Sequence, residues 1–68
     1  MIRTNLKYYR EKRFFTQKEL AEKSGVSIRM IQSYEIKRRD INKAQAITVY
    51  NLANALACNI EDILELDD

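Results

Sequence analysis

The side chains most able to bind a partner are the cations gathered in the first part of the chain. Residues 1–39 carry eleven Lys or Arg and four Asp or Glu, whereas residues 40–68 carry one Lys and six acidic residues. The net charge of +2 therefore hides a basic half of +7 and an acidic half of −5. This asymmetry indicates a polyanionic partner for the first half, and the alternative is a solvated surface of mixed charge.

Catalytic and metal-binding chemistry has few suitable residues in this sequence. The chain has no His and a single Cys, Cys58, which excludes an internal disulfide, a zinc finger, a haem site and a Ser–His or Cys–His nucleophile. We find no glycine loop for phosphate and no acid–base pair in an evident cleft. We therefore expect no enzymatic activity, no cofactor and no metal, and we interpret Cys58 as a core residue.

The composition favours helices joined by short turns. One Gly and no Pro are too few for the turns of many short strands. The length predicts a single domain, residues 1–68, with a marginal core that bundle packing, dimerisation or both must stabilise. No stretch approaches 18 apolar residues and the N-terminus is polar, so we expect no membrane span, no signal peptide and a cytoplasmic location.

Apolar spacing predicts the first helix, which runs from about Ile2 or Thr4 to Arg13. Phe14 and Phe15 follow it, and we expect both to anchor the turn. Residues at spacings of four and three form its amphipathic stripe: Ile2, Leu6, Tyr9 and Arg13.

Capping signals predict the second and third helices. Thr16 followed by Glu19 is a capping box at the start of the second helix, and Gly25 ends it in a left-handed conformation. Ser27 is the N-cap of the third helix. Its apolar side consists of Val26, Met30, Ile31 and Tyr34.

Two further helices are predicted in the acidic half. Asn42 with Gln45 indicates a capping box that opens a fourth helix running to about Ala57. Asn59 with Asp62 repeats the pattern for a short last helix. The expected apolar face of the fourth helix is Ala46, Val49, Tyr50, Ala53 and Leu56, widened by Ile47 and Leu52. That of the last helix is Ile60, Ile63, Leu64 and Leu66, and the tail Asp67–Asp68 is expected to fray.

The segment Thr16–Glu35, TQKELAEKSGVSIRMIQSYE, is the most informative one. It combines a capped helix, a glycine turn and a second capped helix. It resembles the helix-turn-helix domain of the lambda-repressor and Cro-like family, also called the XRE family. A weaker match is LANALACNIEDIL, and the similarity extends from Leu6 to Leu64. The resemblance implies an all-α, compact five-helix bundle of the lambda repressor-like fold, with the helix-turn-helix formed by helices two and three.

The resemblance also implies a DNA-binding surface, because in that family the second helix of the unit enters the major groove by its N-terminal end. The positions matching base contacts are Ile28, Arg29, Gln32 and Ser33. Those matching or expected to make phosphate contacts are Gln17, Ser27, Lys37, Arg38 and Arg39. Arg10 and Glu35 match a family pair that joins the first helix to the end of the third, which we interpret as a structural ion pair.

Three positions depart from the family pattern. Phe14, Lys37 and Ala57 stand at helix ends where the family often has glycine. Either each adopts a left-handed conformation at a cost of roughly 1 kcal/mol, or the helix continues and the turn changes. In the second case the third helix would run past Glu35 and displace the basic residues that follow.

The function that the resemblance implies is a sequence-specific regulator of transcription. We expect a repressor that binds double-stranded DNA as a homodimer on a near-palindromic site, with a protein that regulates it as a possible further partner. The alternative is a protein-interaction module, antitoxin-like or adaptor, that uses the same fold. Convergence of Arg29, Gln17 and the Lys37–Arg39 cluster on one side would favour DNA binding, and dispersal would favour the adaptor.

Overall fold

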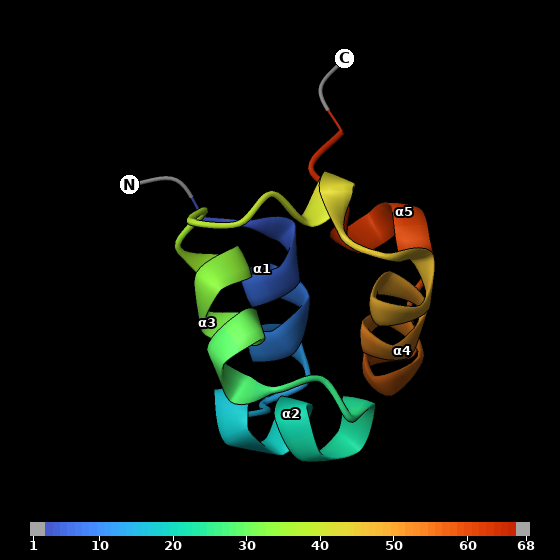
Figure 1. Ribbon diagram of the computed structural model, residues 1–68. Coiled ribbons are helices and arrows are strands. Elements are labelled where there is room, and N and C mark those ends of the chain that lie inside the picture. The colour runs from blue at the N-terminus through green and yellow to red at the C-terminus, as the bar shows by residue number, and fades with distance from the viewer. Residues whose placement is uncertain (1–2, 67–68) are drawn as a thin grey trace.

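The computed structural model describes residues 3–66, and every regular element in that range is helical. The elements are α1 (Asn5–Lys12), α2 (Gln17–Ser24), α3 (Ile28–Glu35), a 3₁₀ turn (Ile41–Lys43), α4 (Ala46–Leu56) and α5 (Ile60–Ile63) (Figure 1). The predicted all-α bundle of five helices is therefore confirmed. The expectations for Ile2, Asp67 and Asp68 lie outside the described residues.

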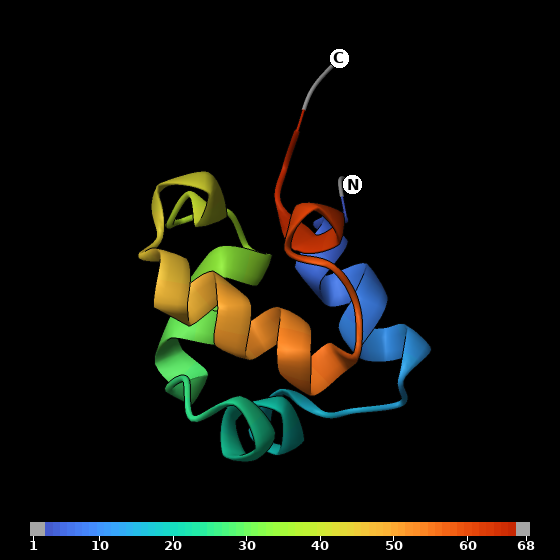
Figure 2. The same cartoon turned by 90° about the vertical axis from the view of Figure 1, so that its right-hand side faces the viewer.

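The helices surround one apolar core. In Figure 1, α1 and α3 lie side by side, α2 crosses beneath them, and α4 and α5 stand opposite. α2 packs against α3 and α4, and α5 packs against α1 and α4, which closes the bundle (Figure 2). The buried apolar residues are Leu6, Leu20, Val26, Ile31, Tyr34, Ile41, Val49, Leu52, Ala53, Leu56 and Ile63.

Side-chain caps fix where α2 and α3 begin. Thr16 accepts a hydrogen bond from the Glu19 amide, and the Glu19 carboxylate accepts one from the Thr16 amide, as the capping box predicts. Ser27 caps α3 by accepting from the amide of Met30. The caps satisfy amide groups that have no partner inside the helix, so the boundaries of α2 and α3 were predictable.

The ends of α1, α3 and α4 are left-handed at residues other than glycine. Phe14, Lys37 and Ala57 have φ of 60°, 63° and 55°. At each end, two backbone amides bond back to carbonyls of the last turn, the pattern of a Schellman motif. These paired bonds offset the steric cost of a side chain in this conformation. The helices therefore stop where the family has glycine, and α3 does not run past Glu35.

Two sequence expectations about helix ends were wrong. Asn42 does not cap the fourth helix: it lies in the 3₁₀ turn, and Gln45 precedes α4 without a side-chain cap. The Asn42 side chain is instead paired with the backbone amide and carbonyl of Glu65, both at 2.8 Å. α5 ends at Ile63, so Leu64 and Leu66 lie beyond it.

The expected core face of α4 was also partly wrong, because the buried face of this helix differs from the one that the sequence predicted. Ala46 is exposed, and Ile47 and Tyr50 are 60% and 53% exposed. Leu52, which was expected only to widen the face, is completely buried. Phe14 is 92% exposed and does not anchor its turn, whereas Phe15 packs against the core.

None of the helices within residues 3–66 has the length and hydrophobicity that a membrane-crossing segment requires.

Replacing Ala57 by Gly tests the strain at the end of α4. We expect the free energy of unfolding to rise by about 1 kcal/mol, because glycine adopts a positive φ without a Cβ clash. Urea unfolding measures the change. Ala55→Gly, inside the same helix, is the matched control and should lower stability by about 1 kcal/mol. A fall in stability for Ala57→Gly would show that the left-handed turn carries no strain.

Candidate nucleic-acid interface

Helix α3 has one buried and one exposed face. Ile31, Tyr34 and Glu35 face the interior. Three of the four expected base-contact residues, Ile28, Arg29 and Gln32, are exposed, and they fall on neighbouring turns of the helix. The fourth, Ser33, is half-buried, and its carbonyl oxygen accepts the amides of Arg38 and Arg39. The first two turns of α3 therefore offer a side-chain surface that no other residue from 3 to 66 covers.

An ion pair on the buried side of α3 holds this helix in place. Arg10 of α1 donates to both carboxylate oxygens of Glu35, through Nε at 2.6 Å and through a terminal nitrogen at 3.0 Å. The two side chains are only 11% and 3% exposed. The hydrogen bond with Glu35 raises the pKa of Arg10 above its ordinary value, so the guanidinium stays charged.

The same ion pair reaches two further elements. Arg10 also donates to the carbonyl oxygen of Phe15, at 2.8 Å, in the segment between α1 and α2. Glu35 accepts a third hydrogen bond, at 2.9 Å, from Nε2 of Gln17 at the start of α2. One carboxylate thus fixes α1, α2 and α3 relative to each other, because each helix contributes a side chain to it.

Gln17 links this buried pair to the exposed face. Its Oε1 lies 3.4 Å from Nε2 of Gln32 on α3. Gln17 and Gln32 are therefore brought together, and Ser27 lies one residue before α3 with its oxygen occupied by the cap to Met30. The Ser27 hydroxyl hydrogen remains able to donate to a further acceptor.

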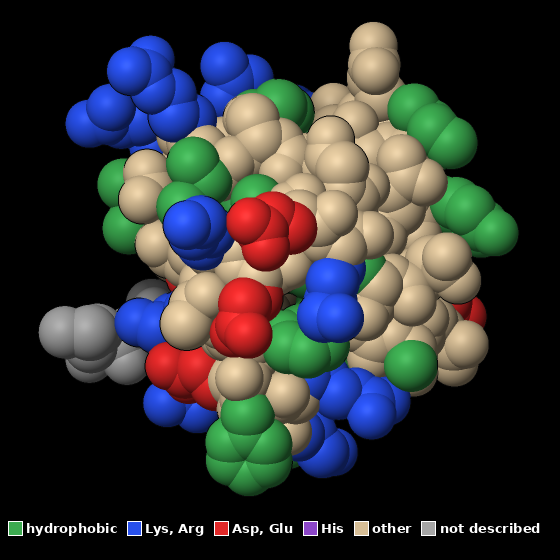
Figure 3. All heavy atoms as spheres, turned by 90° about the horizontal axis from the view of Figure 1, so that it is seen from below, with side chains coloured by type: hydrophobic (Ala, Val, Ile, Leu, Met, Phe, Trp, Pro, Cys, Tyr) green, Lys and Arg blue, Asp and Glu red, His purple; other side chains and the backbone are tan. Residues whose placement is uncertain are grey.

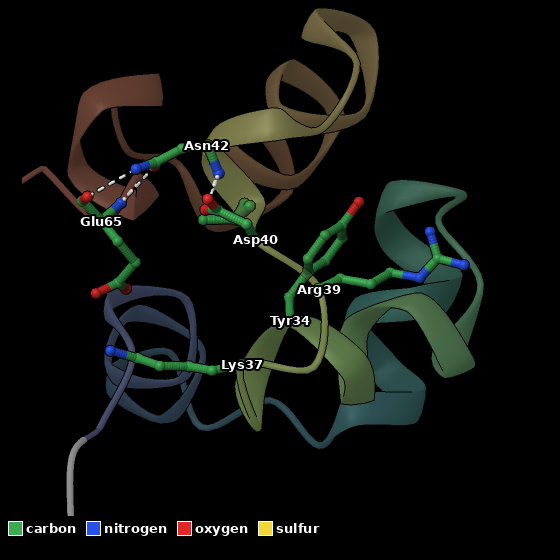
Figure 4. A pocket seen from close by; sticks show the side chains of 7 residues that line it. Tyr34, Lys37, Arg39, Asp40, Asn42 and Glu65 are labelled. Atoms are coloured by element: carbon green, nitrogen blue, oxygen red, sulfur yellow. Dashed lines mark hydrogen bonds between the residues drawn. The ribbon is translucent and has the colours of Figure 1, made fainter.

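The three cations after α3 do not all point the same way. In Figure 4, Lys37 extends towards the side on which Glu65 lies, while Arg39 extends in the opposite direction. Arg39 borders an open hollow of about 450 Å³ together with Met30 of α3, Thr48 of α4 and Gln45, which precedes α4. The expected cluster Lys37–Arg39 is thus divided, and Arg39 is the member that lies beside α3.

Lys43 lines the same hollow as Arg39 and was missed by the sequence analysis. Its position in the 3₁₀ turn brings a cation from the acidic half of the chain next to the α3 surface. A signal was present, since Lys43 is the single basic residue after Arg39. Its place beside α3 was not predicted, because the residues around it were expected to begin the fourth α-helix rather than to form a separate 3₁₀ turn.

The outer face of α2 has no uniform charge. Figure 3, which views the molecule from the α2 end, shows acidic side chains near the middle of the face with Lys and Arg around them. The exposed residues of α2 are accordingly two cations and two anions: Lys18, Glu19, Glu22 and Lys23. The outer face of α2 therefore offers no uniformly basic surface.

Cys58 and the acidic residues offer no metal site in the described part of the chain. No group of three His, Cys, Asp or Glu side chains gathers among residues 3–66. Cys58 is half-buried against the core, and burial raises the pKa of its thiol. The neutral thiol is the poorer nucleophile and the poorer metal ligand.

The comparisons with known proteins agree with this arrangement. A family model described as helix-turn-helix matches residues 6–63. No curated protein sequence matches the chain significantly. The matched range covers all five helices except the first residue of α1. The chain therefore belongs to the lambda repressor-like (XRE) family of DNA-binding helix-turn-helix regulators.

Proposed function

We propose that this protein is a sequence-specific repressor that binds double-stranded DNA as a homodimer, with the N-terminal part of α3 in the major groove. The observation that carries the proposal is the uncovered face of α3, where Ile28, Arg29 and Gln32 are exposed. The ion pair Arg10–Glu35 holds the opposite face of the helix in the core. The role is one of binding and includes no catalytic step. Such a role also implies a cytoplasmic location, in which the protein has access to the DNA that it regulates.

The base-reading side chains differ in what each recognises. Arg29 forms no salt bridge with any residue between 3 and 66, so its fork is available to donate to O6 and N7 of guanine. Ile28 offers apolar contact to a thymine methyl, and Gln32 matches N6 and N7 of adenine. Ser33 is half-buried and contributes less to the contact.

Phosphate contacts orient α3 in the groove. We assign them to the start of α2 and α3 and to the segment after α3, where amide groups and cations surround the exposed face. These residues are Gln17, Ser27, Lys37, Arg38 and Arg39, to which the hollow beside α3 adds Lys43. Because Lys37 points away from Arg39, we expect Lys37 to contribute least.

A homodimer is part of the proposal because one such helix reads only a few base pairs. The large apolar residues left exposed on α4 and α5 are the candidate surface: Ile47, Tyr50 and Ile60. Tyr50 and Ile60 border one hollow of about 310 Å³, and Ile47 lies one turn from Tyr50 on the same helix. Ile63 is fully buried and unavailable to a partner. Repression would then follow from occlusion, since a bound dimer blocks access of the polymerase.

In vitro selection from a random duplex library tests the proposal. We expect enrichment of two inverted half-sites whose centres lie about one helical turn, roughly 10 base pairs, apart. On the selected duplex, Arg29→Ala should relax the preference at one base pair per half-site and cost about 1–3 kcal/mol there. A flat selection with weak, strongly salt-sensitive binding would contradict the proposal and favour the alternative, a module that binds another protein.

Salt dependence on the selected duplex tests the phosphate assignments. Arg39→Ala should lower the slope of log K against log salt by about 1 for each bound protomer, because one fewer counterion is released. Lys37→Ala is the matched control from the same segment and should change the slope less. Equal effects of the two substitutions would mean that the opposite directions of these side chains have no consequence on DNA.

A further inference from the structure

The contacts around Gln17 form a chain that runs from the core to the DNA-facing surface. Arg10 donates to Glu35, Gln17 donates to Glu35, and Gln32 donates to Gln17. Each link has a defined polarity, since an ionised carboxylate only accepts hydrogen bonds and a side-chain amide has one donor end and one acceptor end. The direction of donation at the buried end therefore determines the direction at the exposed end.

The buried carboxylate fixes the orientation of the Gln17 amide. Glu35 is paired with the guanidinium of Arg10, so a flipped Gln17 would bring its carbonyl oxygen against the oxygens of this carboxylate. Gln17 must then turn its NH₂ group towards Glu35 and its Oε1 away from it. That oxygen lies 3.4 Å from Gln32, where it requires a donor.

The orientation of the Gln32 amide follows in turn. One of its two N–H hydrogens is directed to Gln17, which leaves one N–H and the carbonyl oxygen for DNA. Adenine presents one acceptor and one donor in the major groove, N7 and N6, and matches this pair of groups. Guanine presents two acceptors, N7 and O6, so its O6 would face the Gln32 oxygen. A Gln32 free to rotate could turn both N–H groups towards guanine instead.

We infer that Gln17 is a specificity-determining positioning residue, which sets the polarity of Gln32 through Glu35 and so selects adenine over guanine. This inference rests on the proposed function, since it assumes that α3 reads bases. It assigns Gln17 a role beyond that of a phosphate ligand. The two roles are separable because a phosphate needs only a donor, whereas Gln32 needs an acceptor.

Gln17→Lys separates the two roles in one substitution. Lysine can donate to Glu35 and to a phosphate, yet it has no acceptor for Gln32. Because lysine brings an added cation to the phosphates, we expect Gln17→Lys to bind the selected duplex more tightly overall. We also expect the ratio of affinities for adenine and guanine at the base pair read by Gln32 to fall by about fivefold or more. Gln17→Met, similar in length but without donor or acceptor, should lose the same discrimination.

The measurement is a set of duplex affinities in which that one base pair is varied, with circular dichroism melting to verify that each variant is folded. Gln32→Ala identifies the base pair, and adding Gln17→Lys to it should cause no further loss of discrimination. Lys18→Ala is the matched control, because it removes an exposed cation from the same turn without touching the chain of amides.

The outcomes distinguish this inference from the proposed function. If the unaltered protein prefers certain bases but folded Gln17→Lys and Gln17→Met keep the full preference for adenine, the inference is wrong and the proposed function stands. The inference is equally wrong if Gln32→Ala leaves every base preference unchanged. If the unaltered protein has no base preference at all, the proposed function fails and the inference fails with it.

Discussion

The arrangement of this small bundle depends on the buried carboxylate of Glu35. It accepts two hydrogen bonds from Arg10 and one from Gln17, so α1 and α2 are each joined to α3 at one point. A buried ion pair adds little net stability compared with apolar residues of similar size, because both charges lose their hydration. Its directional bonds, in contrast, allow one relative placement of the helices. We therefore regard the pair as a device that positions the exposed face of α3.

The helix ends supply the second constraint. Phe14, Lys37 and Ala57 each hold a left-handed conformation that glycine would adopt more easily. The paired backbone hydrogen bonds at these ends turn the chain immediately after each helix, so the helices are short and the turns are tight. Lys37 stands in one of these turns, and its side chain and that of Arg39 extend in opposite directions (Figure 4).

The sequence predicted the parts of the fold that local chemistry controls. Thr16, Glu19, Gly25 and Ser27 act within a few residues of their own positions, and their signals were interpreted correctly. Asn42 carried a similar signal, but its side chain pairs with the backbone of Glu65, 23 residues away. Such a contact cannot be predicted from neighbouring residues, and the same holds for which face of α4 is buried. For the candidate site, residue types were predictable, whereas the link from Gln17 to Gln32 required the packing of α2 on α3.

Replacing the ion pair by apolar residues tests most directly whether it positions the recognition surface. In Arg10→Met/Glu35→Leu the charges are absent together, so no unpaired group remains and the protein should stay folded. Base preferences of this variant on the selected duplex are then compared with those of the unaltered protein. The account predicts that discrimination weakens both at the base pair read by Gln32 and at the one read by Arg29, because the pair positions the whole exposed face of α3. A folded variant with unchanged preferences at both positions would contradict it.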